Sequence, residues 1–378
     1  MRTALSTLLT MVVALLALGI VMLASSSSVK GLNELHDPLF FMKRQLVWLF
    51  IAVVGAVCVA RFDYHWWRKV AIPLAAVSLT LLVLVFVPGI GYKAGGSFRW
   101  LRLGPFTFQP SELAKFAVVI ALASWMTYSG RRVTRLKDGT VLPLIGLGVV
   151  LGLLLLEPDY GATFLVGAVG MLILFAGGAR WSYLTVAGAA GACLFAAAVM
   201  QNEVRMKRIL AFLMPEKYPV QAYHLQQSKV AFMVGQLHGV GLGDSMQKQL
   251  YLPEPHTDFI FAIIGEELGF LATGTVVLLF LGLLTCGLII STKAPDTFGR
   301  LLGFGLTMML CVQAAINIGV VIGCLPTKGI SLPFISYGGS NLLISLASVA
   351  VLANIALHSL KPTPDPHVKP IRDSRRTV

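Results

Sequence analysis

Residues 5–24 read LSTLLTMVVALLALGIVMLA, an uncharged and almost wholly apolar run. An α-helix of this length crosses the hydrocarbon core of a bilayer, which is about 30 Å thick. A signal peptide also begins with a basic residue and an apolar run, here followed by Ala24 and four serines. The run is longer than the core of a typical signal peptide, and similar runs follow it. We therefore expect a first transmembrane helix that is retained.

The rest of the chain repeats this pattern. Of its 378 residues, 56% are hydrophobic and 12% are charged, and that charged share is about half of what soluble domains carry. The composition therefore predicts an all-α polytopic membrane protein rather than a soluble domain. The apolar runs predict about ten transmembrane helices, near residues 5–24, 44–60, 70–88, 111–128, 141–156, 161–178, 181–200, 259–290, 300–323 and 341–359.

Basic residues in short loops set the orientation of such a protein. The loops 61–69 and 129–140 and the C-terminal tail are rich in Lys and Arg and fall on the side of the N-terminus, so both termini are expected in the cytoplasm. Residues 1–360 then form a single transmembrane domain, and the Pro-rich basic tail 361–378 is expected to be disordered. A large extracytoplasmic loop, about 201–258, is expected between the seventh and eighth helices, partly on the membrane surface.

The net charge of +13 needs no nucleic-acid partner, because basic loops in membrane proteins set topology and contact anionic lipid. Basic residues also lie in the outer loops, where an anionic ligand would require them. They include Arg44, Arg99, Arg102, Arg205, Arg208 and Lys328. The five cysteines lack the spacing of metal or redox sites, and no metal ligands are predicted.

Ionisable residues near the ends of apolar spans are candidates for function, because they are costly close to hydrocarbon. In QPSELAK at 109–115, Glu112 and Lys115 share one helix face, although an ordinary helix start with a local ion pair explains the same spacing. In LPEPHTDF at 252–259, Asp258 lies where the outer segment enters the eighth span. Asp258 is either a catalytic carboxylate or a helix cap.

Two further segments carry candidates. The loop PTKGISLPFISYGGS at 326–340 contains Lys328 and Ser336, which either line a polar site or belong to a glycine-rich connector. Arg44 lies at the mouth of the second span, and Asp159 lies in the turn between the fifth and sixth spans. Snorkelling side chains and lipid head groups also explain charges at such edges.

Together these segments resemble the SEDS family (shape, elongation, division and sporulation) of peptidoglycan glycosyltransferases, which includes FtsW and RodA. The last segment is more similar to the division branch, typified by FtsW, although Pro255 stands where that branch usually has alanine. The matching segments run in order through almost the whole chain: KRQLVW at 43–48, FQPSELAK at 108–115, EPDYG at 157–161, LPEPHTDFIFAIIGEELG at 252–269 and LPTKGISLPFISYGGSNL at 325–342.

The resemblance implies a multi-pass protein of the bacterial cytoplasmic (inner) membrane that polymerises lipid II, a disaccharide-pentapeptide on undecaprenyl pyrophosphate. It implies Asp258 as the essential acid. Substrate-binding residues are expected at Arg44, Glu112, Lys115, Asp159 and Lys328, with Ser336 as a further polar lining residue.

The implied partners are a class B penicillin-binding protein transpeptidase, divisome or elongasome proteins, membrane lipid, and the growing glycan on undecaprenyl pyrophosphate. The resemblance implies no particular cofactor, and a bound divalent cation, Mg²⁺ or Mn²⁺, is compatible with the chemistry.

A lipid II flippase is the alternative from another class, and Glu266 and Glu267 within the eighth predicted span would suit it. A flippase needs a polar path that reaches both sides of the membrane, whereas a polymerase needs its polar cluster on the outer side alone. The candidate residues concentrate outside, which favours the enzyme. A scaffold that recruits the transpeptidase is a third reading and is compatible with the enzyme.

Overall fold

The computed structural model describes residues 1–94, 97–104, 106–253 and 255–360, so the predicted disorder of residues 361–378 lies outside the described residues. Within the described chain, eight helical segments are long and apolar enough to cross a membrane. They contain α1 (Arg2–Ser26), α3 (Phe40–Arg61), α6 (Pro110–Ser129), α7 (Leu142–Leu156), α9 (Trp181–Met200), α12 (Ile260–Thr292), α13 (Thr297–Val321) and α14 (Gly339–His358).

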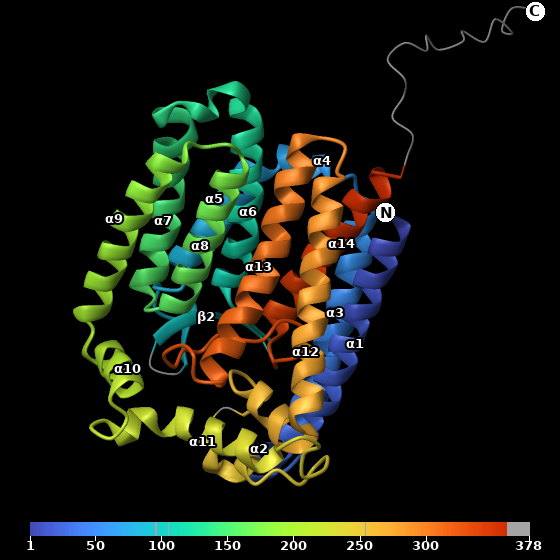
Figure 1. Cartoon of the computed structure of the whole chain (residues 1–378), viewed down its shortest axis with the longest axis vertical. Helices are drawn as coiled ribbons and strands as arrows, with labels where there is room; N and C mark the ends of the chain where they lie inside the picture. Colours follow the sequence, from blue (N-terminus) through green and yellow to red (C-terminus); the bar gives the residue numbers. More distant parts are fainter. Residues whose placement is uncertain (95–96, 105, 254, 361–378) are drawn as a thin grey trace, which may run out of the picture.

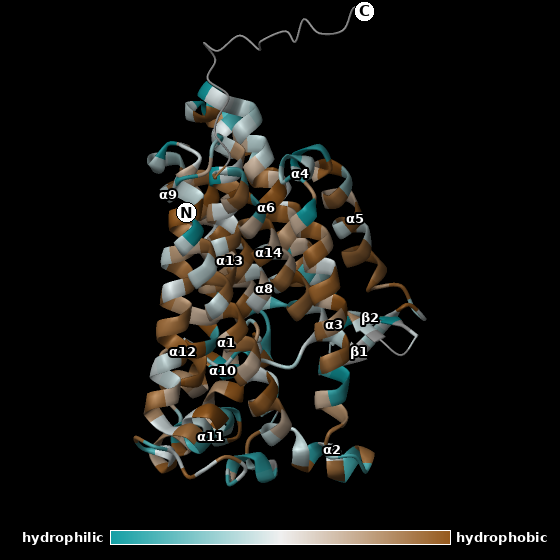
Figure 2. Cartoon of the chain, turned by 90° about the vertical axis from the view of Figure 1, so that its right-hand side faces the viewer, coloured by the Kyte–Doolittle hydropathy of each residue, from teal (hydrophilic) through white to brown (hydrophobic). Residues whose placement is uncertain are grey.

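Two shorter apolar helices, α5 (Ala71–Leu84) and α8 (Tyr160–Ala176), lie where the third and sixth spans were predicted. The multi-pass helical architecture is therefore confirmed, while the count of ten spans stays a prediction. The hydropathy view agrees with this architecture, since hydrophobic residues cover the long helices and hydrophilic residues gather toward the ends of the bundle (Figure 2).

The N-terminus and the end of α14 lie at the same end of the bundle, together with α4 (His65–Lys69), η1 (Gly130–Thr134) and η2 (Lys137–Val141) (Figure 1). Their basic residues assign this end to the cytoplasm. At the opposite end, called the outer end below, lie α2 (Ser28–Leu35), α10 (Glu203–Leu213) and α11 (Pro219–Gly235) (Figure 1). The segment 201–258 contains these last two helices and η3 (Gln247–Tyr251), and its partial placement on the membrane surface stays a prediction.

The core of the bundle is built around α13 and α14. In α14, 83% of the apolar stretch is buried, whereas α9 at the left edge of Figure 1 is 11% buried and faces lipid along most of its length. Helix α13 packs against α6, α8, α12 and α14, and α3 packs against α14. This arrangement fixes the outer ends of α6, α8, α12 and α14 relative to one another.

Helix α12 consists of two helical parts on either side of Gly269, whose backbone is left-handed (φ 75°, ψ −171°). A Cβ at this position would lie 2.4 Å from the backbone nitrogen of Gly239, so only glycine fits. The break leaves backbone carbonyls of α12 without helical hydrogen-bond partners. N–H groups of residues 201–258, called the outer segment below, bind these carbonyls. The N–H groups of Val240 and Gly241 donate to the carbonyls of Glu266 and Glu267, both at 3.0 Å.

The side chains of Glu266 and Glu267 also bind the outer segment. Glu266 accepts hydrogen bonds from the Ser245 hydroxyl and from the N–H of Met246. Glu267 forms a buried ion pair with Lys248 (Oε1 to Nζ, 3.0 Å) and accepts from the Ser25 hydroxyl at 2.6 Å. Both acids therefore anchor the outer segment and do not lie along a path across the membrane.

A small antiparallel sheet was not predicted from the sequence. Its strands β1 (Gly91–Ala94), β2 (Ser97–Leu103) and β3 (Phe106–Phe108) pair in the order β1-β2-β3 and connect α5 to α6. In the stretch SFRWLRL of β2, Arg99 and Arg102 are three residues apart and therefore project from opposite faces of the strand. The sheet carries Arg99 and Arg102 to the outer end of the bundle.

Candidate active site

Four helix N-termini meet at the outer end of the bundle. They belong to α6, α8, α12 and α14. The N–H of Gln109 donates to Ser340 Oγ at 3.0 Å, and its side-chain amide donates to Asp159 Oδ2 at 3.5 Å. The N–H of Tyr337 donates to the carbonyl of His256 at 3.0 Å. Helix N-termini carry partial positive charge, so their convergence favours an anionic ligand.

Asp258 lies immediately before α12 and is partly exposed. Its carboxylate lies against Gly329, where a Cβ would come within 2.5 Å of Oδ2. Its backbone carbonyl accepts a hydrogen bond from Asn317 Nδ2 at 2.8 Å. Burial lowers the pKa of Arg208 in α10, and the charge of Arg99 lowers it further. The charge of Asp258 raises the pKa of Arg208, so these two side chains lie within electrostatic reach of each other. Asn317 therefore holds the backbone of Asp258, and the Asp258 carboxylate lies within electrostatic reach of Arg208.

The loop between α13 and α14 holds the segment that precedes Asp258. Ser336 is 2% exposed, and its hydroxyl donates to the carbonyl of Thr257 at 2.6 Å while accepting from the N–H of Leu332 at 2.8 Å. The hydrogen bond to Thr257 therefore joins two loops, and the one from Leu332 shapes the α13–α14 loop itself. The ring of His256 packs between Phe41 and Tyr337, with centroid distances of 4.8 and 5.8 Å.

Arg44 lies near the start of α3 and is partly exposed. It lines an outer cavity of about 300 Å³ together with Tyr92, Arg102 and Thr107. Two arginines therefore share this cavity, one from α3 and one from the sheet. Arg44 is also close enough to Tyr337 to oppose the rise that burial causes in the pKa of that phenol.

Glu112 and Lys115 form the ion pair that their spacing predicts, but the pair is buried. The Lys115 ammonium lies 2.8 Å from Glu112 Oε2 and donates to Gln313 Oε1 at 2.8 Å. Gln313 in turn donates to Asn341 Oδ1 at 3.2 Å and to the carbonyl of Ser331 at 2.9 Å. This buried network joins α6, α13, α14 and the outer loop, and Lys115 is 5% exposed within it.

Asp159 is the N-cap of α8, where its Oδ1 accepts from the N–H of Ala162 at 3.1 Å. The turn before it is held by two arginines from distant elements. Arg99 of the sheet donates to the carbonyls of Glu157 and Pro158, and Arg205 of α10 donates to the carbonyl of Pro158 at 3.2 Å. The turn therefore gathers cations that lie far apart in the sequence.

Lys328 completes this cationic cluster. Its ammonium lies over the ring of Phe195 at 5.2 Å and over that of Phe164 at 5.9 Å. The pKa of Lys328 is lowered to about 8, chiefly by burial. The charges of Arg205 and Arg99 contribute to the lowering, and the charge of Asp159 opposes it. We define the outer cationic cluster as Arg99, Arg205, Arg208 and Lys328. Lys328 and Arg205 lie within electrostatic reach of Asp159, and Arg208 lies within that of Asp258.

Glu157 is a buried carboxyl within the same turn, and within the described chain neither of its side-chain oxygens has a hydrogen-bond partner. Burial, and then the charge of Asp159, raises the pKa of Glu157 to about 8, and Arg99 opposes that rise. A carboxyl whose pKa is raised by folding makes the fold less stable as pH rises from about 4.5 to 8, because over this range the unfolded chain ionises while the folded state still holds the proton.

The variant Glu157→Gln is therefore expected to raise the melting temperature by several degrees at pH 8.5 and to change it little at pH 4.5. Thermal unfolding of the purified protein in detergent at both values measures the difference. The exposed acid Glu216 provides the control, and Glu216→Gln should shift the melting temperature equally at both pH values. An equal shift for Glu157→Gln at the two pH values would show that folding does not raise the pKa of this carboxyl.

Sequence reasoning left several residues of this site unassigned. Arg99, Arg205 and Arg208 were recognised as outer charges but not as neighbours, because only folding brings the sheet and α10 beside the α7–α8 turn. The amides Gln313, Asn317 and Asn341 were missed, although polar side chains within apolar spans were a usable signal.

In the described parts of the chain, no group of three or more His, Cys, Asp or Glu side chains has an arrangement that would hold a metal ion.

A bundle of apolar helices with a charged site at one end defines a polytopic membrane protein suited to an amphiphilic anion. The chain belongs to the cell cycle protein family of FtsW, RodA and SpoVE, whose family model matches residues 6–361. It is 45% identical to the probable peptidoglycan glycosyltransferase FtsW of Trichlorobacter lovleyi over 350 residues, which are 92% of each chain. It is 39% identical to the stage V sporulation protein E of Bacillus subtilis, over 91% of this chain and 94% of that protein.

Solved structures give the same result. A chain of a peptidoglycan synthase complex, described as coordinating polymerization and crosslinking, matches with a TM-score of 0.77 and 30% identity, over 94% of this chain and 98% of that one. The rod shape determining protein RodA of Thermus thermophilus matches with a TM-score of 0.70 and 28% identity, over 94% and 97%. The family and the apolar helices establish a multi-pass protein of the bacterial inner membrane.

Proposed function

We propose that this protein is a peptidoglycan glycosyltransferase that polymerises lipid II at the outer face of the cytoplasmic membrane. The observation that carries the proposal is the position of Asp258, a partly exposed carboxylate within electrostatic reach of Arg208, which belongs to the outer cationic cluster. The relatives named as probable glycosyltransferases support the reaction class.

The reaction needs a base for the acceptor. The 4-hydroxyl of the acceptor sugar attacks the anomeric carbon of the donor, which carries an α-linked undecaprenyl pyrophosphate. The Asp258 carboxylate takes the hydroxyl proton, the new β-1,4 bond forms with inversion, and the bond to the pyrophosphate breaks. A positioned carboxylate contributes roughly 10²–10⁴-fold to such a step.

The departing pyrophosphate needs positive charge. Arg208 lies within electrostatic reach of Asp258 and Lys328 within that of Asp159, and Arg44 shares its outer cavity with Arg102. Lys115 is engaged with Glu112 and Gln313, so we assign this pair to holding the start of α6 in place. Asp159 orients the α7–α8 turn, and Ser336 holds the loop beside Asp258.

A divalent cation fits this scheme as a ligand of the substrate pyrophosphate rather than of a protein site. We further propose a class B penicillin-binding protein as partner, together with divisome or elongasome proteins. Similarity to FtsW and to the sporulation protein favours the division type over the elongation type.

The flippase is not favoured. Glu266 and Glu267 were the acids that suited transport, and both are bound to the outer segment and to α1. The charged residues of the candidate site gather at the outer end, as a polymerase requires.

The activity itself is tested by incubating the purified protein with lipid II, alone and with a class B transpeptidase, and separating the products by gel electrophoresis. Glycan strands are expected from the wild type in at least one condition. Bound lipid II without product in every condition would contradict the proposal and favour a scaffold.

Lys328 gives a prediction on pH. Because its pKa is lowered to about 8, its charge is present below this value and is lost as pH rises through it. The KM for lipid II is therefore expected to rise several-fold between pH 7 and 9 in the wild type. In Lys328→Arg the rise should be smaller, since a guanidinium stays charged. Identical KM profiles for the two proteins would exclude Lys328 as a pyrophosphate ligand.

A further inference from the structure

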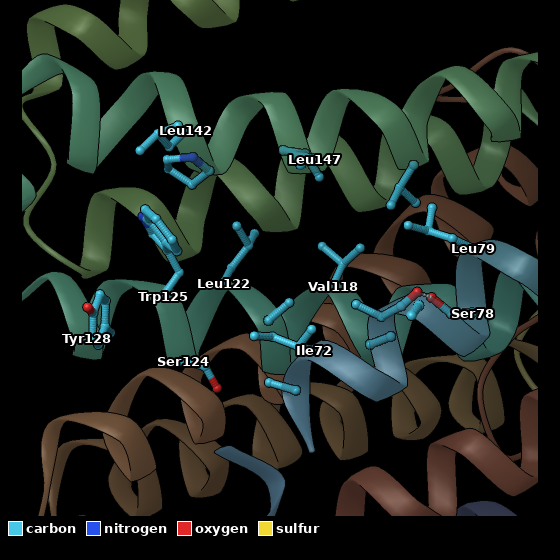
Figure 3. A pocket seen from close by; sticks show the side chains of 18 of the residues that line it. Ile72, Ser78, Leu79, Val118, Leu122, Ser124, Trp125, Tyr128, Leu142 and Leu147 are labelled. Atoms are coloured by element: carbon cyan, nitrogen blue, oxygen red, sulfur yellow. Dashed lines mark hydrogen bonds between the residues drawn. The ribbon is translucent and has the colours of Figure 1, made fainter. Parts of the chain in front are cut away.

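A cavity of about 640 Å³ lies between α5, α6 and α7, apart from the outer site. Its lining comes from the cytoplasmic half of these helices, and Figure 3 shows Ile72, Leu79, Val118, Leu122 and Leu147 around the open space. Apart from one end, the lining side chains are almost all apolar. A void of this kind is filled by apolar groups in a membrane, because empty space forfeits dispersion contacts.

This cavity, called the groove below, exists because α5 and α7 both pack on α6 while small residues line the space between them. Ala75 on α5, Ala121 on α6 and Gly146 on α7 are among the lining residues. A Cβ at Gly146 would meet no atom within 4 Å. The chain itself therefore leaves room for a slender apolar occupant such as an acyl chain.

The cytoplasmic end of the groove is polar and basic. Arg68 lines it and is exposed, and Trp125 and Tyr128 stand beside it. The Arg132 guanidinium lies 5.5 Å from the centre of the Tyr128 ring, which places a second cation at this mouth. The indole of Trp125 donates to the carbonyl of Asp138 at 2.8 Å. Aromatic residues mark the level of the membrane interface, and basic pockets between helices on this side bind anionic head groups.

We propose that this groove binds an anionic phospholipid of the cytoplasmic leaflet. An acyl chain lies against α6 between α5 and α7, and the head-group phosphate contacts Arg68 and Arg132. The charge of the mouth selects the anionic lipid over a zwitterionic one. The lipid-linked substrate has its pyrophosphate at the opposite end of the molecule, where it would meet the outer cationic cluster and not Arg68.

The site has a structural consequence that does not depend on catalysis. Helix α5 has 14 residues, about 21 Å at 1.5 Å per residue, and so is shorter than the hydrocarbon core. It leads directly into the sheet that carries Arg99. A lipid bound between α5 and α7 braces α5 against α6, so occupancy should also stabilise the fold.

Native mass spectrometry of the delipidated protein, titrated with phosphatidylglycerol or phosphatidylcholine, tests the proposal. Wild type is expected to retain phosphatidylglycerol at about tenfold lower lipid concentration than phosphatidylcholine. Gly146→Leu fills the groove and should lose this retention. Gly148→Leu is the matched control on the same helix, because its Cβ also meets no atom within 4 Å and Gly148 does not line the groove.

Substitutions of the exposed arginines test the proposal without changing the packing of the groove. Arg68→Ala with Arg132→Ala should abolish the preference for phosphatidylglycerol, while Arg61→Ala with Arg135→Ala removes the same charge at the same end and should keep it. Phosphatidylglycerol should also raise the melting temperature of wild type and not of Gly146→Leu. Equal retention by Gly146→Leu and Gly148→Leu, or retention of undecaprenyl phosphate in preference to phosphatidylglycerol, would overturn the proposal.

Discussion

Replacing Asp258 with asparagine is expected to lower the rate of lipid II polymerisation by roughly 10²–10⁴-fold, the contribution of a positioned general base. The amide keeps the shape of the side chain next to Gly329 but does not accept a proton. Since Asp258 is partly exposed, its loss should change the melting temperature little.

The kinetic comparison measures kcat and KM for lipid II in wild type and Asp258→Asn. A fall in kcat with a modest change in KM is expected. Asp244 lies in the outer segment and is exposed, so Asp244→Asn is the matched control and should retain wild-type kcat. A kcat for Asp258→Asn near that of the control would remove Asp258 as the base.

The second large effect is expected at the buried ion pair. Lys115→Ala leaves the Glu112 carboxylate, which is 6% exposed, without its ammonium partner. Breaking a buried pair in this way costs about 3–5 kcal/mol, so we expect poor folding or a sharply lowered melting temperature. Lys217→Ala removes an exposed outer charge and should do neither.

A double variant separates stability from function at this pair. Glu112→Gln with Lys115→Met removes both charges and should recover most of the lost stability, because neutral replacement of a buried pair is often tolerated. Its kcat/KM should nevertheless stay at least about tenfold below wild type, since the network through Gln313 and Asn341 no longer fixes the start of α6. Full activity would assign the pair to folding alone.

Hydropathy predicted the positions of the helices because burial in lipid requires long uncharged runs, and the predicted ends differ from the observed ones by a few residues. It could not predict the break at Gly269, since the signal is one glycine whose need for φ of +75° arises from contact with Gly239. The sheet at 91–108 was missed because its strands are short and lie between two apolar helices.

The candidate site likewise has features that the sequence predicts and features that arise only from contacts across the fold. The motifs predicted the pairing of Glu112 with Lys115 and placed Asp258 at the start of α12, because both follow from positions along one helix. The gathering of Arg99, Arg205 and Lys328 around the α7–α8 turn depends on contacts across the fold. For the same reason, sequence alone did not indicate that Ser336 is engaged in joining two loops.

The most direct test of the account uses proteoliposomes in which lipid II is confined to one leaflet. With lipid II in the leaflet that faces the outer end of the bundle, we predict glycan strands in that leaflet and no transfer of lipid II to the other one. Transfer of intact lipid II between leaflets without strands would contradict the account, because it would make this protein a transporter and leave the outer carboxylate without a catalytic role.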